Sequence, residues 1–112
     1  MKTQLPTLFV PHGAPTFALQ PGAAGAALAE AASRLPRPRA IVIISPHWDT
    51  EVATVGQAER LSTIHDFYGF PQELYQLSYP ATGCPEGAHE VAAAISAAGL
   101  PVREVASDGL DH

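Results

Sequence analysis

The chain has few charged side chains, a single cysteine and no long apolar run, and each shortage excludes a class of protein. Six Lys and Arg against eleven Asp and Glu give a formal net charge of −5, so the basic surface that binds phosphate backbones is missing and we expect no nucleic-acid partner. No apolar run approaches the ~20 residues that span a bilayer, and no secretory signal is visible, so we expect no membrane partner. Cys84 alone cannot form an internal disulfide, which fits a reducing compartment and predicts a cytoplasmic protein.

What is present is typical of a globular chain, with 46 % hydrophobic residues in a length of 112. Residues 7–10 (TLFV) form a short apolar run between two prolines, and residues 40–45 (AIVIIS) contain four consecutive β-branched residues. Such continuous runs are typical of strands buried on both faces. Between them, the alanine-rich residues 23–34 predict a helix. The start of the chain therefore predicts a β-α-β unit with a right-handed crossover.

The rest of the chain continues this alternation of strands and helices. Residues 52–57 alternate weakly and predict a further strand, and residues 102–105 predict the last one. Residues 85–98 predict a second helix, with a proline near its start and Gly99 as its stop. Residues 61–79 are rich in aromatic residues, proline and glycine, and we expect a long ordered loop there with one helical turn near residues 71–75. The predicted fold class is α/β, a mostly parallel sheet with flanking helices.

Three of the five histidines follow predicted strands. His12 and His47 each come directly after a proline that ends an apolar run, and His112 follows the last strand. Because open α/β sheets bind ligands at the carboxyl ends of their strands, we expect the active site at that edge. Imidazole is a common ligand of Zn, Fe and Cu, so a metal site is one interpretation. The alternative is that each histidine only caps a strand end by hydrogen bonding to a turn.

The two remaining histidines and the cysteine have more ordinary surroundings. His65 precedes Asp66 within the aromatic segment, where it could orient an aromatic substrate or simply belong to a loop held by its own aromatic side chains. His89 lies in the middle of the second predicted helix, and we interpret it as an ordinary helix residue. Cys84 has no evident base beside it and is interpreted as structural.

Four blocks occur along the chain in a distinctive order. They are residues 9–15 (FVPHGAP), 44–48 (ISPHW), 64–71 (IHDFYGFP) and 109–112 (GLDH). Together they resemble the class III extradiol ring-cleaving dioxygenases, specifically the 4,5-DOPA extradiol dioxygenase-like branch. Members of that branch are longer, so the resemblance implies that residues 1–112 are the N-terminal part of a single catalytic α/β domain whose C-terminal half is absent.

The resemblance implies a non-haem Fe(II) enzyme that opens a catechol-type ring with O₂, with Zn(II) possible in place of iron. By their positions in the matching blocks, His12 and His47 correspond to metal ligands. His112 and, less directly, His65 are implied as catalytic residues, and Phe67 and Tyr68 as part of the substrate pocket. The remaining metal ligand and a further acid–base histidine lie outside this chain, so we expect the 112 residues alone to be inactive or nearly so.

Two other functions remain open at this point. The same histidines could form a zinc-dependent hydrolase that activates water, or the chain could be a catalytically inactive metal-binding fragment. A chain that lacks half of its sheet should also expose apolar surface, so self-association is expected.

Overall fold

The computed structural model describes residues 4–106 and 109–112, which divide into two compact units. The first unit comprises residues 4–39 together with Gly69–Gln76, and the second comprises Ala40–Tyr68 together with the described part of Leu77–His112. No helix among the described residues is long and apolar enough to cross a membrane.

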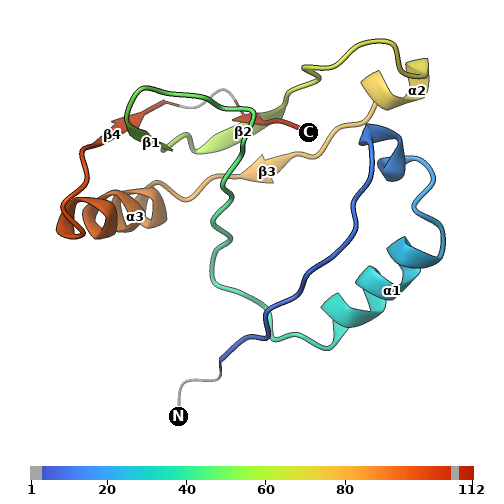
Figure 1. Ribbon diagram of the computed structural model, residues 1–112, viewed down its shortest axis with the longest axis horizontal. Helices are drawn as coiled ribbons and strands as arrows, with labels where there is room; N and C mark the ends of the chain where they lie inside the picture. Colours follow the sequence, from blue (N-terminus) through green and yellow to red (C-terminus); the bar gives the residue numbers. More distant parts are fainter. Residues whose placement is uncertain (1–3, 107–108) are drawn as a thin grey trace. The chain divides into compact units, whose positions relative to one another are not determined.

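The first unit is helical (Figure 1). A short 3₁₀ helix, η1 (Pro15–Ala18), precedes α1 (Gly22–Ser33), and α2 (Gln72–Tyr75) packs against η1. Its one buried side chain in the described residues is Leu74 of α2, which is 3 % exposed. The predicted helix over residues 23–34 and the helical turn near residues 71–75 are confirmed, because alanine-rich sequence and a leading proline favour helix locally.

The second unit contains a parallel strand pair covered by a helix (Figure 1). Strand β1 (Ala53–Gly56) pairs in parallel with β4 (Val102–Val105), and α3 (Pro85–Ala97) packs against both strands. Ala92 is buried, at 4 % exposed, and lies on this helix. The two predicted strands and the second predicted helix are therefore confirmed, and so is the α/β class.

A second sheet in the same unit has the strand order β3–β2–β5. Strand β2 (Arg60–Thr63) pairs antiparallel with β3 (Ala81–Thr82) and parallel with β5 (Gly109–Leu110). The N–H of Ile64 donates to the carbonyl oxygen of Leu110 at 2.8 Å and extends the parallel ladder. The prediction of an ordered loop for residues 61–79 is wrong at its start, where residues 61–63 belong to β2. The local sequence does not indicate this strand, because its partners β3 and β5 lie far away in sequence.

The strands predicted at residues 7–10 and 40–45 are also wrong in the described structure, where both segments are irregular chain, one before and one after α1 in the sequence. Phe9 is fully exposed, at 103 %, and Ile44 is 91 % exposed. A strand is stabilised by a neighbouring backbone and by burial of its side chains, and these segments have neither within the described residues. The helix of the predicted β-α-β unit is thus formed, while the strands that should flank it are not.

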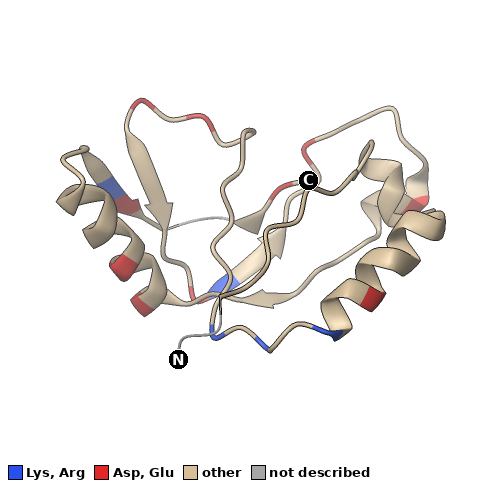
Figure 2. Ribbon diagram, turned by 60° about the horizontal axis from the view of Figure 1, so that its bottom comes forward, with Lys and Arg blue, Asp and Glu red and all other residues tan. Residues whose placement is uncertain are grey.

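Charged residues are sparse along the ribbon (Figure 2). In the first unit, Glu30 and Arg34 form an exposed ion pair one helical turn apart, which contributes about 0.3–0.5 kcal/mol at most. In the second unit, Nδ1 of His89 on α3 lies 3.1 Å from a carboxylate oxygen of Glu104 on β4. His89 therefore links the helix to its sheet, which agrees with its interpretation as a helix residue rather than a site residue.

Candidate active site

The carboxyl ends of β2 and β5 lead directly into a cluster of polar side chains. Because the two strands are parallel, with Thr63 opposite Leu110, the segments that follow them leave the sheet at the same edge. Asp66 follows β2, and His112 follows β5. The ladder therefore places these two side chains next to each other although 46 positions separate them in sequence.

A short hydrogen bond joins the two residues. Nδ1 of His112 lies 2.5 Å from Oδ1 of Asp66, with 28 % of the His112 side chain and 35 % of the Asp66 side chain exposed. This hydrogen bond lowers the pKa of the Asp66 carboxyl from its ordinary value of 3.8, against a smaller opposing effect of burial. Asp66 is therefore a carboxylate near neutral pH and accepts the hydrogen bond from the ring.

His47 is held at the same edge by a second carboxylate. The hydroxyl of Ser45 donates to Oδ1 of Asp111 at 2.7 Å, and the backbone N–H of His47 donates to the Ser45 hydroxyl at 3.1 Å. Nδ1 of His47 lies 3.3 Å from the same Asp111 oxygen. With Nδ1 facing a carboxylate, Nε2 is the nitrogen that His47 can offer to a metal, an arrangement common around histidine ligands.

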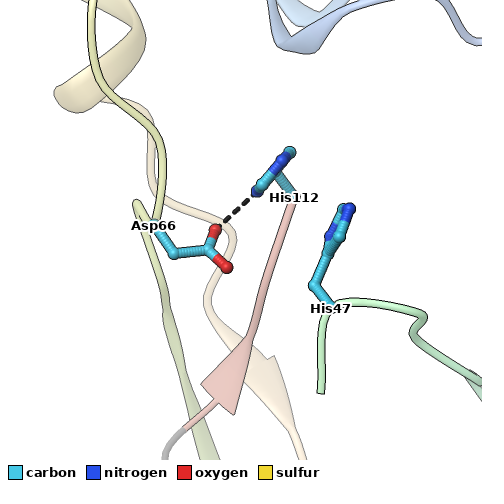
Figure 3. Close-up of side chains that lie close together, drawn as sticks. All are labelled: His47, Asp66 and His112. Carbon is cyan, nitrogen blue, oxygen red and sulfur yellow. Dashed lines mark hydrogen bonds and ion pairs between the residues drawn. The ribbon is translucent and has the colours of Figure 1, made fainter. Parts of the chain in front are cut away.

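The rings of His47 and His112 stack, with their centroids 4.2 Å apart and their planes at 20°. Figure 3 shows His112 between Asp66 and His47, each side chain coming from a different segment of the chain. Phe67 meets the His112 ring edge-on at 5.3 Å. One ligand atom from each of His47, Asp66 and His112 can be chosen such that all three lie within 4.8 Å of one another. Two imidazoles and a carboxylate are a donor set that suits Fe(II) and Zn(II).

The other predicted site residues have contacts of their own. Nε2 of His65 lies 2.7 Å from the carbonyl oxygen of Leu77, so the ring bridges two parts of the second unit that precede and follow residues 69–76 in the sequence. Tyr68 is 91 % exposed. His12 belongs to the first unit, where its Nδ1 lies 3.0 Å from the carbonyl oxygen of Gly13. The roles predicted for these residues remain predictions.

Two carboxylates of the cluster were not among the candidate residues from the sequence. Asp66 and Asp111 each stand directly beside a histidine, in the pairs His65–Asp66 and Asp111–His112. This adjacency was the available signal. Adjacency in the sequence does not identify the histidine that each aspartate contacts. Asp66 contacts His112, and Asp111 contacts His47, each in another segment of the chain.

Comparisons with known proteins match nearly the whole chain. The family described as the catalytic LigB subunit of aromatic ring-opening dioxygenase matches residues 7–112. A 4,5-DOPA dioxygenase extradiol of Escherichia coli (strain K12) is 45 % identical over 83 residues, which are 74 % of this chain and 31 % of that protein. Proteins of the same name from Beta vulgaris and Mirabilis jalapa are 35 % and 43 % identical, over 95 % and 68 % of this chain. The matched regions cover 41 % and 28 % of those two relatives, so the chain spans less than half the length of these proteins.

Proposed function

Because the chain belongs to the LigB family of aromatic ring-opening dioxygenase catalytic subunits, we propose that it carries part of the active site of an extradiol dioxygenase. The substrate in this proposal is a catechol-type ring, DOPA or a related compound, and the second substrate is O₂. The names of the relatives support the substrate class. The observation that carries the proposal is the cluster of His47, Asp66 and His112 at the carboxyl ends of two parallel strands.

Within the cluster, the imidazole of His47 is a donor that fits a divalent transition metal. In our proposal His47, through Nε2, and His12 hold Fe(II), with Zn(II) possible in its place. Bound iron would bring the catechol and O₂ together and would make the catechol hydroxyls more acidic. The contact between Nδ1 of His47 and Asp111 supports this assignment, since it leaves Nε2 for the metal.

His112 is the residue of this chain that we propose for proton transfer. Its ring stacks on the proposed ligand His47, so it would lie next to a substrate held by that metal. An imidazole nitrogen in that position can take the proton of a catechol hydroxyl, which is general base catalysis. Phe67, edge-on to the same ring, contributes an apolar surface next to an aromatic substrate. His65 remains a second catalytic candidate because it belongs to the matching block of residues 64–71. Its contact with the carbonyl oxygen of Leu77 indicates instead that it holds two parts of the chain together.

The test is an activity assay of the full native protein that contains these 112 residues, loaded with Fe(II) and supplied with DOPA. We expect the protein to consume O₂ and to form a coloured ring-opened product. Both should be lost in the variants His47→Ala and His12→Ala, because each removes a ligand. His89→Ala is the matched control, since that imidazole is 76 % exposed and lies on α3. Full turnover in His47→Ala would contradict the ligand assignment.

A zinc-dependent hydrolase remains the second candidate, because two histidines and a carboxylate are also a donor set of zinc enzymes that activate water. The two functions differ in their need for O₂. Anaerobic hydrolysis of an ester or amide by the zinc-loaded protein, without ring opening under air by the iron-loaded protein, would favour the hydrolase.

A further inference from the structure

The hydrogen bond between Asp66 and His112 indicates a role for Asp66 in the active site. We propose that Asp66 is a positioning residue, which holds the Nδ1 proton of His112 so that Nε2 faces the substrate, and that it does not bind the metal. This inference rests on the proposed function for the identity of the substrate, while the state of the His112 ring can be measured without any substrate.

The choice of nitrogen follows from the chemistry of the two groups. An ionised carboxylate has no proton to donate, so in the 2.5 Å contact Nδ1 of His112 must be the donor. A neutral imidazole carries one proton. With that proton fixed at Nδ1, the lone pair that can accept a proton from a hydroxyl group is on Nε2.

The orientation of the ring is fixed by three side chains from two segments of the chain. Asp66 holds Nδ1, the ring of His47 covers one face at 4.2 Å, and Phe67 meets the ring edge-on at an interplanar angle of 82°. Asp66 and Phe67 both follow β2, so the β2–β5 ladder fixes their position relative to His112. These contacts restrain a side chain that would otherwise rotate about two bonds, and a general base must be held in a narrow range of positions.

The competing interpretation is that Asp66 is itself a metal ligand with His47 and His112, since suitable atoms of all three lie within 4.8 Å of one another. The contact that is formed argues for positioning. Nδ1 of His112 cannot donate a proton to Asp66 and a lone pair to a metal at the same time. Oδ1 of Asp66 already accepts that proton, at a distance typical of a strong charge-assisted hydrogen bond.

The experiment compares Asp66→Asn and Asp66→Glu with the unchanged native protein. For Asp66→Asn we expect kcat for ring opening to fall about 10–100-fold, as for other residues that orient a catalytic group, with little change in KM. We expect Asp66→Glu to recover part of that loss, because it restores a carboxylate. Zn(II) affinity, measured by competition with a chromophoric chelator, should stay the same in both variants.

A spectroscopic measurement gives the second readout. Nitrogen-15 NMR of the zinc-loaded protein should show His112 with its proton on Nδ1, and Asp66→Asn should shift the ring toward a mixture of both tautomers. Asp49→Asn is the matched control, because Asp49 is an exposed carboxylate in the same unit. Retained amide signals of β2 and β5 would verify that the variants are folded.

Three results distinguish the possibilities. A large loss of Zn(II) affinity in Asp66→Asn would show that Asp66 is a ligand and would overturn the inference. An unchanged His112 tautomer in that variant would overturn it as well. Absence of ring opening by the unchanged protein would contradict the proposed function only, because the tautomer of His112 is observed without substrate.

Discussion

Two parts of the second unit, the β2–β5 pair and residues 40–44, differ in what supports their backbone. Strands β2 and β5 hydrogen-bond to each other in parallel, and the ladder continues to Ile64. Residues 40–44 are irregular chain, and the four large apolar side chains among them are 62–91 % exposed. A sequence that favours a strand is therefore not sufficient to form one here. Strand β2 forms because β5 pairs with it, whereas residues 40–44 have no such pairing within the described residues.

The same difference divides the candidate site. Asp66 and His112 are placed by a backbone ladder. His47 comes at the end of the unpaired segment and is placed by side-chain hydrogen bonds that involve Ser45 and Asp111. The positions of Asp66 and His112 thus depend on strand pairing, and the position of His47 depends on the carboxylate of Asp111. Substitutions in the ladder and at Asp111 should therefore have separate effects.

The largest effect is expected at residues 41–44, which have no strand partner among residues 4–106 and 109–112. We expect the 112-residue chain to self-associate, because contiguous exposed apolar side chains favour burial against another copy. The double variant Ile41→Lys, Ile44→Lys should weaken association by about 3 kcal/mol, roughly a hundredfold in dissociation constant. Sedimentation or gel filtration over a range of concentrations measures it.

The control for this effect is Leu100→Lys, at a leucine that is 58 % exposed but lies outside the apolar segment. It should leave the association unchanged. A monomeric unmodified chain at high concentration would contradict the prediction and would show that exposed side chains at residues 41–44 are tolerated in solution.

The next effect is expected in the parallel ladder itself. A Cβ atom at Gly109 would collide with the backbone carbonyl of Ser62, so β5 approaches β2 this closely only with glycine at that position. Gly109→Val should destabilise the fold by about 1–3 kcal/mol in denaturant unfolding and should separate Asp66 from His112. Ala106→Val, at an exposed position outside the strands, is the control. Unchanged stability in Gly109→Val would mean that the ladder contributes little.

A comparable or smaller effect is expected at the carboxylate beside His47. Asp111→Asn should weaken Zn(II) binding about 10–100-fold, since the partner that fixes the orientation of the histidine ligand is lost. Ser45→Ala should cost less, about 1 kcal/mol, because it removes one hydrogen bond to Asp111 and leaves the carboxylate in place. Equal affinities for the two variants and the unchanged protein would show that Asp111 does not support His47.

The sequence predicts local structure better than it predicts pairing. The helices and the strands over residues 52–57 and 102–105 follow from composition, caps and apolar pattern, which act over short distances. Strand β2 was not predicted, because its parallel partner is 47 positions away and only two residues long. For the same reason Asp66 and Asp111 could be seen beside histidines in the sequence, but their actual partners depend on the fold.

The smallest effect is expected in the acid range, at the Asp66–His112 hydrogen bond. In the folded, metal-free protein the pKa of Asp66 lies below its ordinary value of 3.8, because the carboxylate accepts the hydrogen bond from His112. Protons therefore bind more weakly to the folded than to the unfolded state. The resulting stabilisation is present above pH 3.8 and is lost as the pH falls through the lowered value.

His112→Ala should return the pKa of Asp66 toward 3.8, which carboxyl carbon-13 NMR measures directly. Because both side chains are partly solvated, we expect a clear change in the titration of Asp66 and only a slight change in stability. An unchanged titration in His112→Ala would mean that a group other than His112 sets the pKa of Asp66.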